Sequence, residues 1–203
     1  MYLFFKPFLD FILAVFIFIL IAPLIILICF FLKIFTKGDI FFIHKRIGFN
    51  GKIFSLYKFR TMKHNRKYLL ENYFRLNKNA KDEWNQTQKL KNDPRITEIG
   101  YYLRDLSLDE LPQIINIIKG DMSFVGPRPI VQKEIEKYGN AYKEYAKCKP
   151  GLTGLWQVSG RNDTTYQKRV ELDLFYAKHR SLWLDIKIIL KTIPVVLSRK
   201  GAY

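Results

Sequence analysis

The sequence contains few cysteines, the residues that disulfide-rich proteins and thiolate metal sites require. Its 203 residues include only two cysteines, Cys29 inside a long apolar run and Cys148 far from it. Neither a disulfide framework nor a thiolate metal site is therefore predicted, and a reducing, cytoplasmic setting fits this cysteine usage. The three histidines are equally scattered along the chain. A histidine-rich catalytic cluster is not predicted either.

Acidic residues are scarce relative to basic ones. The chain has 18 Asp and Glu against 34 Lys and Arg, which gives a formal net charge of +16. Such an excess favours polyanionic partners, namely nucleic acid, anionic lipid head groups or phosphorylated substrates, and charge alone does not choose among them. The length suits one compact domain plus an attachment to something else.

The N-terminal part, residues 1–36, contains one long apolar run. No residue from 11 to 32 carries a charge, so the run is long enough to cross the hydrocarbon of a bilayer as a helix. A single spanning helix is the simpler interpretation. The alternative is a helix that kinks at Pro23, which removes one helical N–H, and returns to the side it entered. Basic residues flank both ends, so the orientation signal does not separate the two topologies.

The remaining residues, 37–203, predict one mainly helical domain with a small sheet. Two β-rich runs flank Asn50-Gly51, a dipeptide suited to the positive φ angles of a hairpin turn. Residues 166–178 predict a helix. Residues 182–200 combine apolar positions with lysines and Trp183, which suits a helix in the membrane interface, although a core helix often shows the same pattern. The predicted fold class is α+β.

Two adjacent carboxylates, Asp109 and Glu110, stand before the apolar run LPQIINII. The Ser107-x-x-Glu110 spacing could form a capping box at a helix N-terminus, whereas Pro112 suits a helix that starts a few residues later. In a basic protein without a histidine cluster, carboxylates are the obvious candidates for a nucleophile and for metal ligands.

Several basic residues are candidates for phosphate contacts. Arg128 lies between two prolines in GPRP, which restrains its backbone and presents a planar bidentate donor. Further candidates are Lys58 and Arg60 in KFRTM, and Arg161 in the Gly-rich segment KPGLTGLWQVSGRN, which is typical of a binding loop. In isolation each is weak evidence, because most basic side chains simply face water.

The order of these motifs carries more information than any one of them. A membrane segment followed by KFRTM, DPRIT, SLDELPQ, KGDMSFVGPRP, KPGLTGLWQVSGRN and ELD resembles the bacterial sugar transferase family, the monotopic phosphoglycosyl transferases. The C-terminal part is most similar to undecaprenyl-phosphate galactose phosphotransferases and their glucose-using relatives. In length the chain resembles the minimal members, which lack additional N-terminal membrane helices.

The resemblance implies an activity and a site. Family members move a phosphosugar from a UDP-sugar to a polyprenyl phosphate and release UMP, through a covalent intermediate on the aspartate of an Asp-Glu pair. That pair matches Asp109 and Glu110, which would also hold Mg²⁺. Arg128 is the foremost expected phosphate contact, and Asp173 in ELD matches a further acidic position.

The resemblance also implies a location. The family's membrane segment is a re-entrant helix that enters and leaves on the cytoplasmic face and is broken at a Ser-Pro pair, which here is Ala22-Pro23. Interfacial amphipathic helices complete the expected fold. We therefore expect an enzyme on the cytoplasmic face of a bacterial inner membrane, in contact with anionic lipid and not with nucleic acid. Whether it forms a homodimer is left open.

Overall fold

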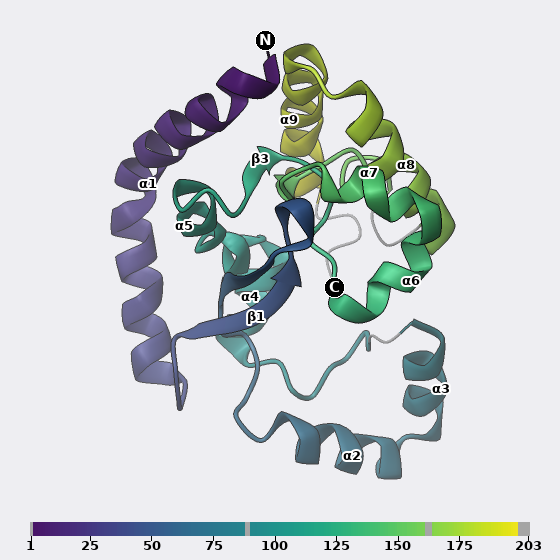
Figure 1. Cartoon of the computed structure of the whole chain (residues 1–203). Helices are drawn as coiled ribbons and strands as arrows, with labels where there is room; N and C mark the ends of the chain where they lie inside the picture. The colour runs from purple at the N-terminus through teal and green to yellow at the C-terminus, as the bar shows by residue number, and fades with distance from the viewer. Residues whose placement is uncertain (1, 88–89, 161–163, 199–203) are drawn as a thin grey trace.

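The computed structural model describes residues 2–87, 90–160 and 164–198 (Figure 1). Its α-helices are α1 (Tyr2–Phe35), α2 (Arg66–Leu76), α3 (Lys78–Thr87), α4 (Glu98–Asp105), α5 (Gln113–Ile118), α6 (Ile135–Tyr138), α7 (Tyr142–Ala146), α8 (Tyr166–His179) and α9 (Leu182–Leu197). The strands are β1 (Phe41–Ile47), β2 (Ile53–Phe59), β3 (Ser123–Val125) and β4 (Gly151–Thr153). Short 3-10 turns lie at η1 (Phe49–Gly51), η2 (Leu108–Glu110), η3 (Gln132–Glu134) and η4 (Gly139–Ala141). The predicted mainly helical chain with small sheets is confirmed.

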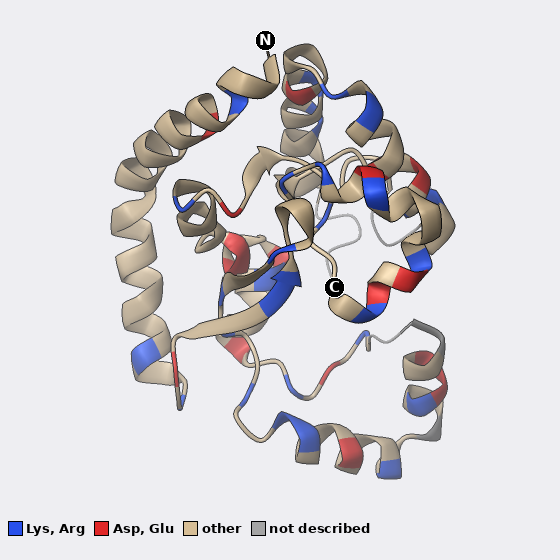
Figure 2. Cartoon of the chain, in the orientation of Figure 1, with Lys and Arg blue, Asp and Glu red and all other residues tan. Residues whose placement is uncertain are grey.

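Helix α1 is long and apolar, and within the described ranges it is the one helix able to cross a membrane by length and composition. It is continuous through Pro23, so the structure shows no interruption of the helix there. Figure 1 shows instead that α1 curves around one side of the domain. Figure 2 shows that charged residues lie toward its two ends, while its long middle part carries none.

The predicted hairpin is confirmed. Strands β1 and β2 are antiparallel, with Ile47 opposite Ile53. Between them Asn50 and Gly51 adopt φ angles of 53° and 75°, which is the left-handed conformation that this dipeptide accepts at low cost. Phe54 and other inward side chains of β2 pack against α1 and α5, so the hairpin is attached to the body of the domain.

A buried asparagine joins α5 to β2. Asn116 is fully buried, and its Oδ1 accepts from the backbone N–H of Tyr57 at 3.1 Å while its Nδ2 donates to the carbonyl of Ser55 at 2.8 Å. The side chain therefore satisfies two backbone groups that would otherwise lack a partner in the core. Since Lys58 follows Tyr57 directly, this contact fixes the position of Lys58 relative to the chain that leads into α5.

We expect Asn116→Ala to destabilise the fold strongly. Each buried polar group left without a partner costs about 1–3 kcal/mol, and the substitution leaves two. Thermal unfolding in detergent should show a lower midpoint than for the wild type. The matched control is Asn140→Ala, because Asn140 is exposed and should tolerate truncation with an unchanged midpoint. Equal midpoints for the two variants would contradict the role given to Asn116.

Strands β3 and β4 form a parallel pair that brings two distant motifs together. The N–H of Gly126 donates to the carbonyl of Thr153 at 3.0 Å, and the N–H of Gly151 donates to the carbonyl of Pro127 at 2.9 Å. The backbones approach so closely that a Cβ atom on Gly151 would lie 2.1 Å from the nitrogen of Gly126. Glycine is therefore required here, and GPRP runs beside KPGLTG. The second motif is partly a strand rather than wholly a loop.

The start of α1 and the first turn of α9 meet at a polar contact. Lys6 on α1 forms an ion pair with Asp185 in the first turn of α9 at 2.5 Å, and the hydroxyl of Tyr2 also donates to Asp185. The hydroxyl of Tyr176 on α8 donates to the other oxygen of Asp185 at 2.8 Å. We call this group, Tyr2, Lys6, Tyr176 and Asp185, the terminal clasp.

Helices α8 and α9 confirm the two C-terminal helices expected from the sequence. In α9 only Asp185 and Ile188 are buried, whereas Trp183, Leu190 and Leu197 are largely exposed. A helix that leaves its large apolar side chains uncovered is not a core helix of this domain. Its placement in a membrane interface remains a prediction.

Candidate active site

The two carboxylates lie on a tight turn between α4 and α5. Asp109 and Glu110 belong to η2, and Pro112 stands at the start of α5. Ser107 has a positive φ of 57° and its side chain caps nothing, so the capping-box interpretation is wrong. The alternative, a helix that starts a few residues later, is confirmed. The turn leaves both carboxylates facing a cavity rather than tied to a helix end.

Lys58 on β2 is the cation nearest to this pair. Its Nζ lies 2.6 Å from Glu110 Oε1 and 3.3 Å from Asp109 Oδ2. The sequence predicted Lys58 only as an anion contact, and the structure places it between the two carboxylates. It therefore offsets the repulsion of two neighbouring negative charges in a partly buried turn.

The ionisation of Asp109 depends on this balance. Burial raises the pKa of the Asp109 carboxyl, the ammonium of Lys58 opposes that rise, and the charge of Glu110 adds to it. The positive charges of Lys58 and Arg104 therefore favour the ionised form of Asp109.

A cavity of about 1620 Å³ opens in front of the pair, and its lining residues divide by element. Most of the charged side chains come from the hairpin and the residue after it, from η2, from the Pro-Arg-Pro segment and from α4. They are Arg46, Lys58, Arg60, Arg104, Asp109, Glu110 and Arg128, and the lining also includes Lys33, Asp39, Lys63 and Arg66. Helices α1 and α9 contribute apolar ones, among them Leu13, Ile17, Ile21, Ile189, Ile193 and Val196. The cavity is thus amphipathic, with the carboxylates within its lining.

Arg60 and Arg104 stand at the charged part of the cavity. Arg60 pairs with Asp39 at 2.7 Å through Nη2, whereas its buried Nη1 has no partner among the described residues. Arg104 donates from Nε to Thr61 Oγ1 at 2.8 Å and raises the positive potential at Asp109. The sequence analysis missed Arg104. The available signal was its position shortly before the Asp-Glu pair in the sequence.

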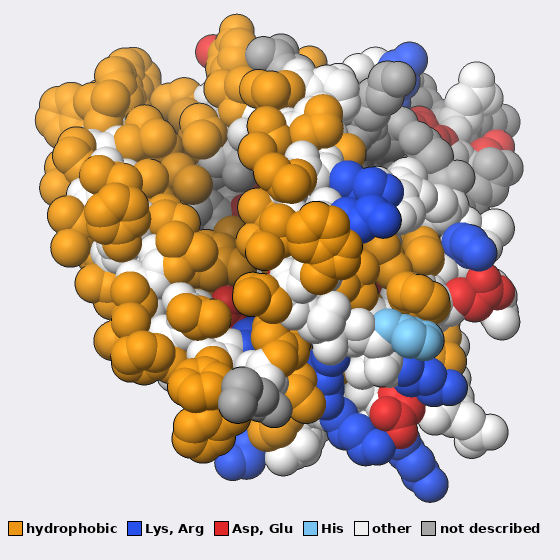
Figure 3. All heavy atoms as spheres, turned by 90° about the horizontal axis from the view of Figure 1, so that it is seen from above, with side chains coloured by type: hydrophobic (Ala, Val, Ile, Leu, Met, Phe, Trp, Pro, Cys, Tyr) orange, Lys and Arg blue, Asp and Glu red, His pale blue; other side chains and the backbone are white. Residues whose placement is uncertain are grey.

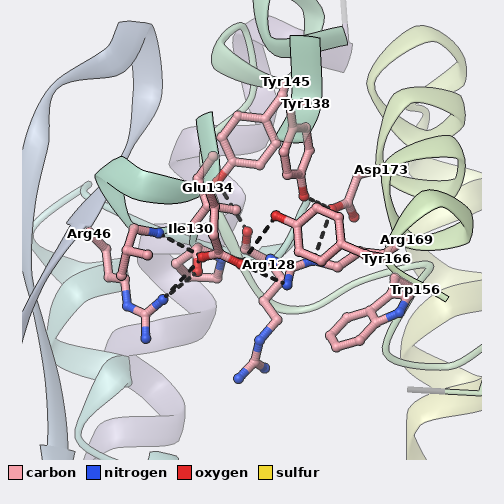
Figure 4. Close-up of polar contacts among 12 residues, drawn as sticks. Arg46, Arg128, Ile130, Glu134, Tyr138, Tyr145, Trp156, Tyr166, Arg169 and Asp173 are labelled. Carbon is pink, nitrogen blue, oxygen red and sulfur yellow. Dashed lines mark hydrogen bonds and ion pairs between the residues drawn. The ribbon is translucent and has the colours of Figure 1, made fainter. Parts of the chain in front are cut away.

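Arg128 points away from the ion pairs behind it (Figure 4). The hydroxyl of Tyr145 donates to its carbonyl at 3.0 Å, so the backbone is held from one side. Its guanidinium lies 5.6 Å from the ring of Trp156 and lines the cavity. With its backbone held and its guanidinium near the Trp156 ring, Arg128 presents its planar fork to the cavity. Trp156 was missed as an individual residue, although its Gly-rich segment was singled out.

A second guanidinium lies close to Arg128. Arg46 on β1 donates to the carbonyl of Pro129 at 3.2 Å, and the charge of Arg128 lowers the pKa of Arg46 after the larger effect of burial. Glu134 lies 3.8 Å from Arg46, and its negative charge offsets part of the repulsion between the two arginines. The pair adds positive potential to the wall of the cavity. Nothing in the local sequence around Arg46 indicated this.

Asp173 is not part of the cavity lining. It is buried on α8, accepts from the hydroxyl of Tyr138 at 2.6 Å and lies 3.9 Å from Arg169. Burial raises the pKa of its carboxyl to about 6, despite the opposing effects of Tyr138 and Arg169. Figure 4 shows Asp173 beside Tyr138, and Asp173 does not line the cavity that Asp109 lines. Arg161 lies outside the described residues.

The comparisons with known proteins agree with this geometry. The family model described as "Bacterial sugar transferase" matches residues 1–199. The exopolysaccharide production protein ExoY of Rhizobium meliloti is 50% identical over 185 residues, which cover 91% of this chain and 82% of that protein. The undecaprenyl-phosphate galactose phosphotransferase of Salmonella typhimurium is 47% identical over 98% of this chain, which corresponds to 42% of that longer protein.

The name of a third relative specifies UDP-glucose. The UDP-glucose:undecaprenyl-phosphate glucose-1-phosphate transferase of Escherichia coli is 39% identical over 96% of this chain and 40% of its own length. The family match over nearly the whole sequence and the coverage of a relative of similar length lead to one conclusion. The chain belongs to the bacterial sugar transferase family.

Proposed function

We propose that the protein transfers a sugar 1-phosphate from a UDP-sugar to undecaprenyl phosphate, with release of UMP, as the first membrane step in the assembly of a surface glycan. The names of the relatives from Salmonella typhimurium and Escherichia coli support this substrate pair. The observation that carries the proposal is the amphipathic cavity, which has Asp109 and Glu110 in its lining, basic side chains on one side and apolar helices on the other.

The Asp109 carboxylate is the proposed nucleophile. Its oxygen attacks the β-phosphorus of the UDP-sugar, the bond from that phosphorus to the bridging oxygen breaks, and UMP leaves with this oxygen. An acyl phosphate on Asp109 then carries the sugar. In the second step an oxygen of the lipid phosphate attacks the same phosphorus, and the bond to Asp109 breaks. Aspartate is regenerated and a polyprenyl diphosphate sugar is formed.

Asp109 and Glu110 also suit the binding of Mg²⁺. The described residues contain no group of three or more His, Cys, Asp or Glu side chains that could hold a metal alone. Mg²⁺ in phosphoryl-transfer sites is commonly bound by one or two carboxylates together with substrate phosphates, and this pair fits that arrangement. The ion would cancel part of the charge on the pyrophosphate. Lys58 and Arg128 supply the protein's own share of that cancellation.

The contacts of α1 support a re-entrant placement on the cytoplasmic face. Near its start, Lys6 pairs with Asp185 of the domain. Near its end, Ile28 and Leu32 pack with Phe59 and other domain residues. A helix that crossed the bilayer would separate its two ends by about 30 Å of hydrocarbon, whereas both ends of α1 contact the same domain. The curve of α1 in Figure 1 fits a helix that dips into one leaflet and returns.

Site-specific labelling tests this topology. In a background with Cys29 and Cys148 replaced by serine, single cysteines at positions 2 and 36 should both react only with reagent supplied from the cytoplasmic side. Tyr68→Cys on the exposed face of α2 is the cytoplasmic control. Pro23→Ala restores a helical N–H and should shift part of the population toward a spanning helix, with position 2 labelled from outside. Outside labelling of position 2 in the unsubstituted helix would rule out re-entry.

The transfer itself is tested by UMP release. Purified protein is incubated with undecaprenyl phosphate, Mg²⁺ and one UDP-sugar at a time, and a panel containing galactose, glucose and N-acetylated sugars identifies the donor. We expect UMP and one lipid-linked diphosphate sugar in equal amounts with at least one donor. Release of UDP, or no turnover with any donor, would contradict the proposal.

A further inference from the structure

The apolar part of the cavity lies between helices α1 and α9. The chemistry proposed for the charged part does not account for this apolar lining. From α1 the apolar part is lined by Leu13, Ile17 and Ile21, and from α9 by Ile189, Ile193 and Val196. Figure 3 shows that apolar side chains gather on this face and that the surface is hollowed between them. We call this hollow the α1–α9 groove.

One end of the groove is fixed by the terminal clasp. Asp185 joins the first turn of α9 to the beginning of α1 through Lys6 and Tyr2. The groove residues lie further along both helices, from Leu13 on α1 and from Ile189 on α9. The helices are therefore held together at one end, while a gap with apolar walls remains beyond it.

Deeper in, the groove continues into the charged part of the site. Ile114 on α5, Phe124 on β3 and Leu152 on β4 line the same cavity between the two helices and the carboxylates. Lys58 and Arg128 line its charged part. A ligand that fills the whole cavity must have a strongly anionic head and a long, uncharged tail.

We propose that the α1–α9 groove binds the first isoprene units of the acceptor's polyprenyl chain and directs its phosphate to Asp109. This inference rests on the proposed function and adds where the lipid chain lies during the second step. The large exposed side chains Phe16 and Ile19 on α1 carry the apolar surface outward, so the rest of the chain continues into the bilayer.

The charge of the site favours this occupant over an ordinary phospholipid. A polyprenyl phosphate is a monoester with up to two negative charges and nothing beyond its phosphate. A phospholipid phosphate is a diester with one charge and an additional head group. The acceptor phosphate must attack the phosphorus held on Asp109, so it needs a free terminal oxygen. Lys58, Arg60 and Arg128 provide for such a doubly charged group.

Two substitutions on α9 test lipid binding in the groove independently of the reaction with the UDP-sugar. Ile193 lines the groove and is 55% exposed, whereas Leu190 is 60% exposed on the same helix and does not line it. We expect Ile193→Trp to raise the KM for polyprenyl phosphate at least tenfold. Adduct formation from the UDP-sugar alone should continue, since this step does not use the lipid. Leu190→Trp should match the wild type in both measurements.

A direct measurement does not depend on turnover. Wild-type protein in detergent is irradiated with a polyprenyl phosphate that carries a diazirine in its first isoprene unit, and the crosslinked peptide is identified by mass spectrometry. We expect labelling within Ile189–Val196 or Leu13–Ile21, displaced by undecaprenyl phosphate and not by phosphatidylglycerol. Equal displacement by phosphatidylglycerol, or labelling outside both segments, would overturn the groove assignment. Loss of UMP release with specific crosslinking intact would instead overturn the proposed function.

Discussion

Replacement of Asp109 by Asn should abolish both halves of the reaction. The amide has nearly the same size as the carboxylate but cannot act as the anionic nucleophile, so neither UMP release from the donor alone nor overall transfer should be detectable. Loss of an essential nucleophile lowers turnover by roughly 10⁴–10⁶-fold in enzymes where it has been measured. Intact-mass analysis of wild-type protein with UDP-sugar and no lipid should show one added sugar phosphate, mapped to Asp109, and none in the variant.

Glu110→Gln is the matched variant, because it changes the neighbouring carboxylate in the same way. Glu110 has the shorter contact with Lys58, so its loss should disturb the position of that ammonium and weaken any metal held by the pair. We expect turnover to fall roughly 10- to 100-fold while an adduct still forms slowly on Asp109. An adduct found on Glu110 would reverse the two assignments. Absence of any adduct, with kinetics that require both substrates bound together, would favour direct transfer.

Local patterns in the sequence predicted the local structure well. The Asn50-Gly51 turn follows from backbone sterics within four residues, and the helix Tyr166–His179 follows from its own periodicity. The error at Ser107 has a local cause as well. A Ser-x-x-Glu spacing is also compatible with a left-handed serine before a 3-10 turn, and Pro112 then starts the real helix.

The pairing of Asp109 with Glu110 was predictable because the two residues are neighbours in the chain, whereas most of their surroundings were not. Lys58 is about fifty residues before Asp109, and the contact that sets its position runs through Asn116. Arg46 reaches the Pro-Arg-Pro segment only because β1 folds against it. Contacts between residues so far apart in the chain are not visible in local sequence patterns. The order of motifs identified the family, and the fold then showed which basic residues meet.

The surroundings of Asp173, a further acidic candidate from the motif pattern, were also not predictable from the local sequence. The structure buries it on α8 beside Tyr138 and Arg169, outside the cavity lining. A match to the motif pattern therefore does not by itself place a side chain in the cavity that Asp109 lines.

Arg128→Lys should lower kcat/KM for the UDP-sugar strongly. The change retains the positive charge and removes the planar fork of N–H donors. A bidentate guanidinium–phosphate contact presents two parallel N–H donors, whereas an ammonium is a point charge on a mobile stem. The lost hydrogen bond to a charged group is worth about 1.5–3 kcal/mol, which corresponds to roughly a 10- to 150-fold loss in kcat/KM for the UDP-sugar. Lysine also removes the guanidinium that lies 5.6 Å from the centre of the Trp156 ring.

The control for this variant is Arg75→Lys on the exposed side of α2, which makes the same chemical change away from the cavity. It should leave kcat/KM and the melting temperature unchanged. Arg128→Lys should also keep its melting temperature, because the Pro-Arg-Pro backbone is held by the hydroxyl of Tyr145 and not by the guanidinium. A fall in both kcat/KM and melting temperature would assign Arg128 a structural role. Unchanged donor kinetics in a stable variant would remove Arg128 from the phosphate site and leave Lys58, Arg60 and Arg104 as the donor's cationic contacts.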